Sequence, residues 1–393
     1  MTRSPMIDLD QNATTPIDPE VLEAMRPHWL SGGNPESRHG LGRAARRALD
    51  SARQTIAEIL NASSSEILFT SGGSEANRLA LLGLAGIERG PGHLLSTPIE
   101  HPAVSDAIAG LVESGYSQSL IPVTRSGIID AEVAGGLLRF DTRLATSMLA
   151  NNETGAIQPV ARLAAIAAEL GLPTHTDAVQ AVGRIPVDFD ALGAATLAAA
   201  AHKFHGPIGV GCLIVRRGTP FRLPGLLARR EARAVSGTPP VALAVGMAAA
   251  LARRHREAGE RLARMRALRD RLESRIASAD VGPIERNGPI DEAERLPQTL
   301  NLAFPGVDAN ALLMQLDLGG VAASLGSACA SGSMKPSPTL VAMGVPPESL
   351  RASVRLSFGA FTTEHDVDAA ADVIIGVVRR IRESADAGDS SIH

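Results

Sequence analysis

Two charged residues, Asp177 and Lys203, form the most informative pair of side chains in this sequence. Asp177 lies in THTDAVQAVG and Lys203 in AAAHKFHGP, and each follows a short apolar run that is typical of a strand in a parallel sheet. A Lys amine forms a Schiff base with the aldehyde of pyridoxal 5'-phosphate (PLP), and an Asp carboxylate keeps the pyridine nitrogen of PLP protonated. Lys and Asp usually lie on the solvated surface, so the prediction of a PLP site depends on what surrounds the pair.

The elements that must position this pair come from a repeated pattern between about residues 50 and 215. The short apolar segments EILFT, HLLSTP and RLATSMLA are each followed by a stretch with helical periodicity. This alternation predicts a mostly parallel sheet that is covered by helices on both faces. Such sheets bind their ligands at the carboxyl ends of the strands, and we expect the site there.

The strand EILFT leads into SGGSEANR, which predicts a phosphate site. Gly72 and Gly73 allow a close approach to the backbone, Ser74 offers a hydroxyl, and the helix that follows presents free N–H groups at the positive end of its dipole. The same turn also occurs as an ordinary helix N-cap. It matches neither the Walker phosphate loop nor the dinucleotide-binding glycine pattern. Its position upstream of the Asp and Lys favours the phosphate.

Further polar residues follow expected strands or lie within one. His101 in STPIEHPAV is suited to stack on a cofactor ring and to move protons near neutral pH. Asn152, beside Glu153, is suited to hydrogen-bond a phenolate or carboxylate oxygen, and Gln180 follows the strand of the aspartate. Arg355 lies in the apolar strand of SVRLSFGAFTT, where a guanidinium needs an anionic partner such as a substrate carboxylate. Taken singly, such residues are more often turn residues than catalytic ones.

Length and composition limit the classes to which the protein can belong. With 393 residues, 45% of them hydrophobic, we expect one large domain with a smaller companion. The net charge of −4 gives no electrostatic case for nucleic acid or an anionic membrane as the main partner. Neither a signal peptide nor a membrane span is apparent, so we expect a cytoplasmic protein. For the Arg-rich helical pattern from Val241 to about Ala279, a solvated or domain-bridging helix is favoured over a nucleic-acid face.

The two cysteines lie in very different surroundings. Cys212, in GVGCLIV, is expected to be an inert core residue, whereas Cys329, in SLGSACASGSMKPSP, is expected to be an exposed, functional thiol rather than an incidental loop residue. Two cysteines cannot form a disulfide framework or a thiol-based zinc cage. A zinc hydrolase built on His175, His202 and His205 is a weaker alternative because no carboxylate or third ligand has motif spacing, so we expect no metal.

Together these segments resemble the NifS-type cysteine desulfurases, class V aminotransferases among the fold-type I PLP enzymes. The resemblance covers about residues 8 to 370, and it is carried by LDQNATTPIDPEVLEAM, GNPESRH, FTSGGSEANRLAL, IEHPAV, ANNETGAIQPV, HTDAVQAVGRIPVD, HKFHGPIGVG, GSACASGS and SVRLSFGAFTT. It implies an α/β fold with a mostly parallel seven-stranded sheet in a large PLP-binding domain, residues 16–255. A smaller α+β domain, residues 1–15 and 256–393, would carry the catalytic Cys loop.

The resemblance also implies roles for individual residues. It implies that Lys203, Cys329 and His101 are catalytic, with Cys329 as a nucleophile on a mobile loop, and that Asn152 and Arg355 bind the substrate. The residues implied to bind the cofactor are Gly73, Ser74, His101, Asn152, Asp177, Gln180, His202, Lys203 and Thr238. In the implied homodimer, Thr238 of one subunit would reach the PLP phosphate of the other.

The implied reaction converts L-cysteine to L-alanine and transfers the sulfur to an enzyme persulfide and then to an acceptor protein. The GSAC context and the long loop after it resemble the group that serves iron–sulfur cluster assembly and tRNA thiolation. No direct nucleic-acid or membrane partner is implied. Two alternatives stay open: a selenocysteine lyase or other PLP-dependent C–S lyase, and a catalytically impaired interaction subunit that keeps the PLP fold.

Several positions differ from the family pattern. Ala200 stands where the family usually has a phosphate-binding Ser hydroxyl, His205 where Tyr is common, and Ala360 where Arg is common. The segment 226–235 lacks the usual Gly-rich motif. These differences cluster around the expected phosphate site and the loop that would face a second subunit.

Overall fold

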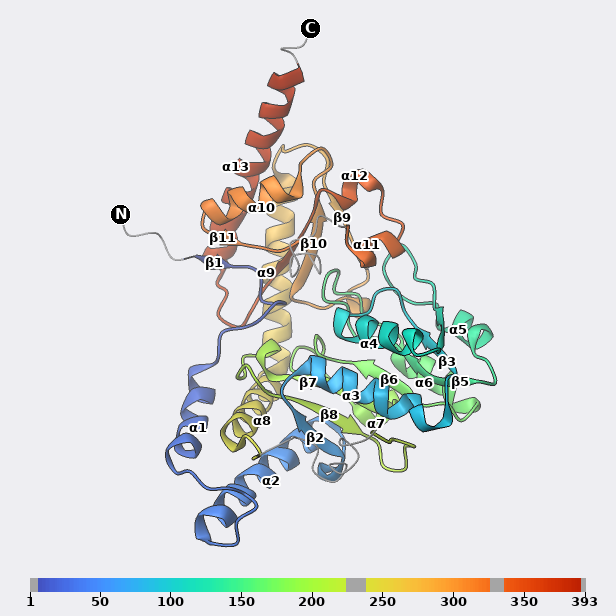
Figure 1. The fold of residues 1–393 in the computed structure, drawn as a ribbon. Coiled ribbons are helices and arrows are strands. Elements are labelled where there is room, and N and C mark those ends of the chain that lie inside the picture. Colours follow the sequence, from blue (N-terminus) through green and yellow to red (C-terminus); the bar gives the residue numbers. More distant parts are fainter. Residues whose placement is uncertain (1–5, 224–237, 326–335, 390–393) are drawn as a thin grey trace.

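The computed structural model describes residues 6–223, 238–325 and 336–389, with side chains as far as Ser384. Its main sheet has seven strands in the order β2-β8-β7-β6-β5-β3-β4, and within it only β8 runs against its neighbours (Figure 1). The prediction of a mostly parallel seven-stranded sheet is therefore confirmed. Its strands are β2 (Ile67–Thr70), β3 (His93–Ser96), β4 (Ser117–Leu120), β5 (Thr142–Thr146), β6 (Thr174–Asp177), β7 (Thr196–Ala200) and β8 (Gly211–Val215).

Helices connect and cover these strands. Those in the first part of the chain are α1 (Pro19–Leu30), α2 (Gly40–Leu60), α3 (Gly73–Ala85), α4 (Pro102–Glu113), α5 (Ala131–Leu137), α6 (Val160–Glu169) and α7 (Phe189–Leu192). Those that follow are α8 (Val241–Arg256), α9 (Ala258–Ser278), α10 (Ala309–Leu318), α11 (Pro338–Ala342), α12 (Pro347–Leu350) and α13 (Glu364–Asp389). The helical stretches that the alternating pattern predicts after EILFT, HLLSTP and RLATSMLA are α3, α4 and α6.

The two faces of the sheet pack against different helices, because successive side chains of a strand point in opposite directions. On β7, Leu197 and Ala199 join the core that α1, α2 and α8 cover, whereas Ala198 joins a core with Leu79 of α3. Cys212 of β8 is fully buried in the first of these cores, which confirms the prediction of an inert core residue. Helices thus cover both faces, as the sequence pattern predicts.

A second, antiparallel sheet of three strands, β12-β10-β9, lies above the main sheet in the view of Figure 1. Its strands are β9 (Glu285–Arg286), β10 (Thr299–Ala303) and β12 (Ser353–Ser357), and a separate parallel pair joins β1 (Ile7–Asp8) to β11 (Val321–Ala322). The hydrophobic core around this sheet is formed with α9, α10 and α13. Its buried residues differ from those of the cores of the main sheet.

The Arg-rich helical pattern is two helices, which are divided at Glu257. Helix α8 packs in the core of the main sheet and α9 in the core of the three-stranded sheet. Arginines on α9 form ion pairs with α13, from Arg271 to Asp368 at 2.7 Å and from Arg275 to Asp372 at 2.6 Å. These arginines therefore serve a helix–helix contact.

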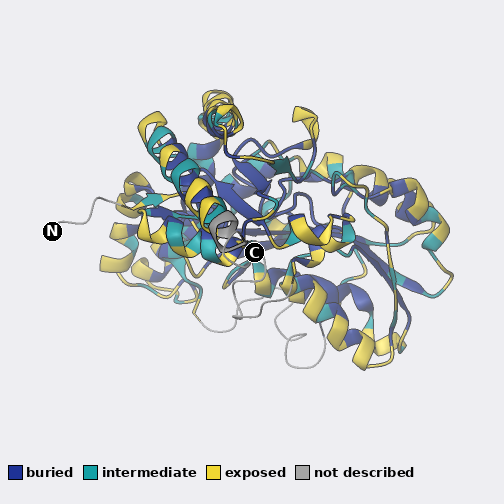
Figure 2. Cartoon of the chain, turned by 90° about the horizontal axis from the view of Figure 1, so that it is seen from above, coloured by how far each residue is buried: buried dark blue, intermediate teal, exposed yellow. Residues whose placement is uncertain are grey.

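Burial follows this layering. Seen from above, the strands are mostly buried, and the outward faces of the helices are exposed (Figure 2). Within the described part of the chain, no helix combines the length and the apolar character that crossing a membrane requires.

Candidate active site

A cavity of about 160 Å3 collects most of the residues that we predicted to bind the cofactor. They come from the carboxyl ends of strands of the main sheet and from the start of α3: Gly73, Ser74, His101, Asn152, Asp177, Gln180, His202 and Lys203. The other residues in its wall are Asn77, Met148, Val179 and Ala200. Thr238 is exposed and lines no part of this cavity, and Cys329 lies outside the described residues.

Asp177 is the last residue of β6, and its carboxylate is 4% exposed. Its Oδ1 accepts a hydrogen bond from the backbone N–H of Val179 at 2.9 Å, and its Oδ2 accepts one from Nδ2 of Asn77 at 2.6 Å. Each carboxylate oxygen can accept a further hydrogen bond. A buried carboxylate that is held in this way can also accept a hydrogen bond from a cationic ring nitrogen in the cavity.

The Lys203 amine meets the N-terminal segment at the cavity wall. Nζ donates hydrogen bonds to the carbonyl oxygens of Asn12 at 2.8 Å and Ala13 at 2.7 Å. Burial, and then the positive charges of Arg184 and Arg355, lower the pKa of Lys203 to about 7. The amine is therefore partly neutral near neutral pH, and a neutral amine is the nucleophile that Schiff-base formation needs.

This lowered pKa predicts a pH dependence of cofactor capture. The pKa of Lys203 is about 7 rather than 10.5, so we expect the rate at which cofactor-free protein captures PLP to rise with pH to a midpoint near 7. The unfolded chain binds this proton more tightly than the folded chain, so the stability of the cofactor-free protein should also rise with pH between these two values. Stopped-flow absorbance across the pH range measures the midpoint. A midpoint above pH 9 would contradict the lowered pKa.

Asn12, which we did not predict as a site residue, forms hydrogen bonds with several residues of the cavity wall. Its carbonyl oxygen accepts from Lys203 and, at 3.0 Å, from Nε2 of Gln180. Its Nδ2 donates to the carbonyl oxygen of Asn152 at 3.1 Å, and its Oδ1 accepts from Arg184. Because it is 1% exposed, these contacts are shielded from water. Its only signal in the sequence is its place in LDQNATTP.

The predicted phosphate site lies at the N-terminus of α3. A side chain at Gly73 would place its Cβ 2.6 Å from Cγ2 of Val179, so the close packing of this turn requires glycine. Ala200, at the end of β7, lines the same cavity with a methyl group. The hydroxyl that the family usually has at this position is therefore absent from the cavity wall.

The two histidines in the wall have neutral rings. His101 caps α4, where its Nδ1 accepts from the N–H of Ala103 at 3.0 Å, so its proton is on Nε2. Burial lowers the pKa of His101. His202 has Nδ1 3.1 Å from Oγ1 of Thr14, and burial lowers its pKa to about 4.

Arg355 lies at the edge of the site, on β12. Its Nη1 donates to the carbonyl oxygen of Asn152 at 3.1 Å, and its Nη2 pairs with Oδ1 of Asp10 at 2.6 Å. The anionic partner that the sequence predicts is therefore supplied here by Asp10. The Nε of Arg355 is buried and has no hydrogen-bond partner among the described residues.

Two positions that differ from the family pattern contact each other. His205 has a left-handed backbone, with φ of 67°, and its Nε2 accepts from the N–H of Ala360 at 3.1 Å. Its Nδ1 then carries the proton and donates to the carbonyl oxygen of Pro16 at 2.9 Å. Both nitrogens are occupied, so His205 is a contact between the loop after Lys203 and the loop after β12.

The three histidines of the zinc alternative do not converge. His175 is hydrogen-bonded to Asn77, His202 to Thr14 and His205 to Pro16. No group of three or more His, Cys, Asp or Glu side chains in the described ranges is arranged to hold a metal ion. The described residues therefore give the zinc hydrolase alternative no support.

The described residues that flank the segment 326–335 lie next to the site. Before it, Ser324 shares two backbone hydrogen bonds with Arg355. After it, Oγ of Ser337 donates to Oε2 of Glu153 at 2.5 Å, and Glu153 is the neighbour of Asn152. Ser324 and Ser337 therefore both lie beside residues of the candidate site.

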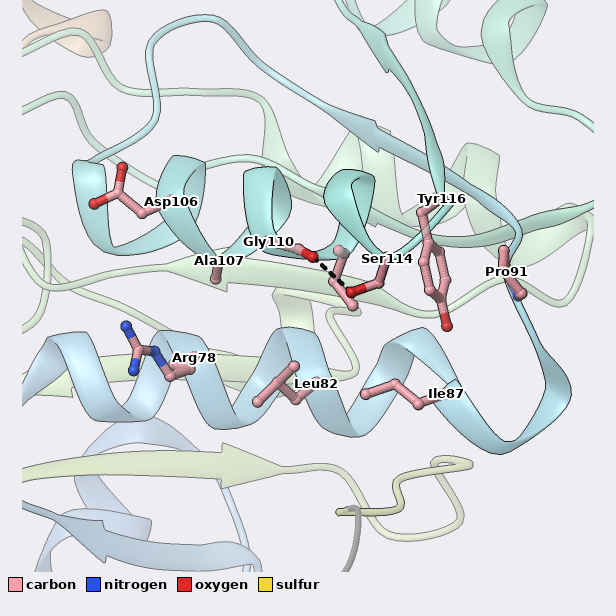
Figure 3. Close-up of a pocket in the computed structure, with 10 residues that line it drawn as sticks. Arg78, Leu82, Ile87, Pro91, Asp106, Ala107, Gly110, Ser114 and Tyr116 are labelled. Carbon is pink, nitrogen blue, oxygen red and sulfur yellow. Dashed lines mark hydrogen bonds between the residues drawn. The ribbon is translucent and has the colours of Figure 1, made fainter.

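A larger cavity of about 400 Å3 lies elsewhere, between α3 and α4 (Figure 3). Arg78 and Asp106 lie at one end and Tyr116 at the other, and the hydroxyl of Tyr116 donates to the carbonyl oxygen of Ala85 at 3.3 Å. No predicted site residue lines this cavity. It is therefore separate from the candidate active site.

The residues of the smaller cavity fit PLP. It combines a Lys amine of lowered pKa, a buried carboxylate and a glycine turn at the start of a helix. In addition, Oε1 of Gln180 is buried without a hydrogen-bond partner among the described residues, which indicates that the wall is built to face a polar group.

Comparison with known proteins shows the family of this chain. The family model described as aminotransferase class-V matches residues 7–370. The chain belongs to this aminotransferase class-V family. Among curated members, an IscS-like cysteine desulfurase of Mycobacterium tuberculosis is 41% identical over 97% of this chain and 98% of its own. Cysteine desulfurase IscS of Dictyoglomus turgidum is 40% identical over 95% of each chain.

Solved structures of similar proteins have the same fold. A NifS-like protein is 33% identical, with a TM-score of 0.87 over 95% of this chain and 99% of its own. The structure titled SspA in complex with cysteine is 30% identical, with a TM-score of 0.77 over 90% of this chain and 99% of its own. The predicted family and fold class, an α/β fold of the fold-type I PLP enzymes, are confirmed.

Proposed function

We propose that this protein is a PLP-dependent cysteine desulfurase, which converts L-cysteine to L-alanine and places the sulfur on one of its own cysteines. The observation that carries the proposal is the single cavity that joins Asp177, Lys203 and the glycine turn of α3. Full-length relatives that are named cysteine desulfurases support it.

Different residues of the cavity would bind different parts of the cofactor. The turn at Gly73 and Ser74, with His202 beside it, would hold the phosphate, and Asn152 and Gln180 would lie near the ring oxygen. When bound, PLP would withdraw electrons from the α-carbon of the substrate. The Asp177 carboxylate would keep a proton on the ring nitrogen, and the ring of His101 would cover one face.

Lys203 serves twice in this proposal, as the covalent attachment point and as a base. With the substrate bound, its Nζ would take the α-proton, and a pKa of about 7 is well suited to that role. The carboxylate of cysteine would bind Arg355, with Asn152 beside it. Nε of Arg355, which has no partner among the described residues, is the donor that this would use.

The sulfur transfer needs no external oxidant. The Cys329 thiolate attacks the substrate sulfur, an S–S bond forms, and the Cβ–S bond breaks. The carbon that loses sulfur receives one proton, and the α-carbon regains the proton that Lys203 took, so the products are alanine and a persulfide on Cys329. An acceptor protein or a reductant would then remove the persulfide sulfur, and iron–sulfur cluster assembly and tRNA thiolation are the processes that we propose it serves.

The architecture belongs to the same proposal. We propose a large domain of residues 16–255 and a small domain of residues 1–15 and 256–393. The separate cores of the two sheets support this division. We also propose a homodimer in which Thr238 reaches the cofactor phosphate of the second subunit, which agrees with its exposure and its absence from the cavity of its own chain.

The test is to incubate purified protein with PLP, L-cysteine and a reductant, and to follow alanine and sulfide together. Equal amounts of both products are expected. Sulfide with pyruvate in place of alanine, or a strong preference for selenocysteine, would favour the lyase alternative. Cofactor binding without turnover of either substrate would favour the impaired subunit.

A further inference from the structure

A line of hydrogen-bonded, buried side chains leads from Thr196 on β7 to Asp177 at the end of β6. Oγ1 of Thr196 lies 2.9 Å from Nδ1 of His175, and Nε2 of His175 lies 3.0 Å from Oδ1 of Asn77. Nδ2 of Asn77 then donates to Oδ2 of Asp177 at 2.6 Å. Thr196 and His175 are fully buried, and Asn77 is 1% exposed. Water therefore does not compete for these bonds.

The direction of every hydrogen bond in this line is fixed by its last member. A carboxylate only accepts hydrogen bonds, so Asn77 must turn its NH2 toward Asp177 and its Oδ1 toward His175. The ring then carries its proton on Nε2, and its Nδ1 accepts from the Thr196 hydroxyl. A neutral ring is what burial favours, because it lowers the pKa of His175 to about 3.

We propose that His175 is a positioning residue, which locks the amide of Asn77 so that the Asp177 carboxylate keeps its hydrogen-bond donor and stays directed at the ring nitrogen of the cofactor. The proposal deepens the proposed function and rests on it. If the amide turned, its Oδ1 would face the carboxylate, and two acceptors would lie in contact. The repulsion would displace the Asp177 carboxylate, and the ring nitrogen would lose the hydrogen-bond partner that keeps it protonated.

Two substitutions of His175 separate this role from packing. The amide group of Gln can occupy the place of Nε2 and donate to Asn77, whereas the shorter Asn reaches only the place of Nδ1. We expect His175→Asn to weaken PLP binding by about tenfold, in line with the loss of a hydrogen bond that supports a charged group. His175→Gln should stay within about threefold of the wild type.

His93 offers a matched control in the same sheet. It lies on β3, is fully buried, and pairs its Nδ1 with Oγ1 of Thr142 at 2.8 Å, but it does not line the cavity. His93→Asn should lower the thermal midpoint of the cofactor-free protein about as much as His175→Asn does. Its affinity for PLP should be unchanged.

The deciding measurement uses 15N-labelled PLP, because the chemical shift of the ring nitrogen reports its protonation directly. The expected result is a shift toward the neutral pyridine in His175→Asn but not in His175→Gln or His93→Asn. If His175→Asn keeps the wild-type shift and dissociation constant, the inference is wrong although the proposed function stands. If the wild type binds no PLP, both are wrong.

Asn77→Leu keeps the inference testable if His175→Asn does not fold. This change removes the amide donor from Asp177 without adding a charge, in a side chain of similar size, so the same loss of ring protonation and weaker PLP binding are expected. Wild-type affinity for PLP and an unchanged 15N shift in this variant would overturn the proposed role of the Asn77 amide.

Discussion

Lys203→Ala is expected to abolish the borohydride-reducible link between the protein and PLP and to lower desulfurase activity by at least about a hundredfold. The change removes both the attachment amine and the base, and loss of a catalytic base alone costs about 10²–10⁴ in rate. Reduction with borohydride, followed by peptide mass analysis, locates the link. Activity is measured as alanine formed from L-cysteine.

The sequence makes this experiment decisive, because it contains only two lysines, Lys203 and Lys335. Lys335→Ala is therefore a complete control for attachment, and it should leave the reducible link on Lys203. Lys203→Arg keeps the positive charge but forms no such link, so it separates loss of covalent attachment from loss of charge. A reducible link to Lys335 in the wild type would refute the assignment.

Cys329→Ala is expected to retain PLP and to bind L-cysteine, yet to form no protein persulfide. The matched control variant is Cys212→Ala. Cys212 is fully buried, and burial raises the pKa of its thiol to about 12, so it provides no thiolate near neutral pH. Cys212→Ala should form persulfide like the wild type, at a stability cost on the order of 1 kcal/mol for the small cavity.

Persulfide is measured by mass spectrometry after alkylation, without reductant. Undiminished persulfide on the Cys329→Ala protein would show that another sulfur carrier operates. Full release of sulfide from L-cysteine by the same variant, with no persulfide in the wild type, would favour the C–S lyase instead.

The sequence was sufficient to predict the parts of the fold and site that depend on local patterns. Alternating strands and helices predict the parallel sheet. Asp177 ends β6 and Lys203 follows β7, and these two strands are neighbours in it. The contribution of Asn12 could not be predicted in this way, because its partners Asn152 and Lys203 are far from it along the chain. Local periodicity carries no information on such pairs.

Other differences also arise from tertiary contacts. The Arg-rich helical pattern divides into α8 and α9 at Glu257, which is neither Pro nor Gly. The division occurs where the chain passes from one core to the other. Arg355 was expected to need an anionic partner, and Asp10 supplies one from the opposite end of the sequence. Asn77 looks like an ordinary helix residue until the fold brings it to Asp177.

The position of Asn12 sets the order in which a newly made chain can complete this site. The backbone N–H of Asn12 donates to Oγ of Ser357, and Ile7 pairs with Val321. The wall against which the lysine amine rests therefore cannot be completed until the chain has been made as far as Ser357. Contacts between such distant residues also form slowly. We therefore expect a nascent chain that stops before Ser357 to bind the cofactor less tightly than one that extends beyond it.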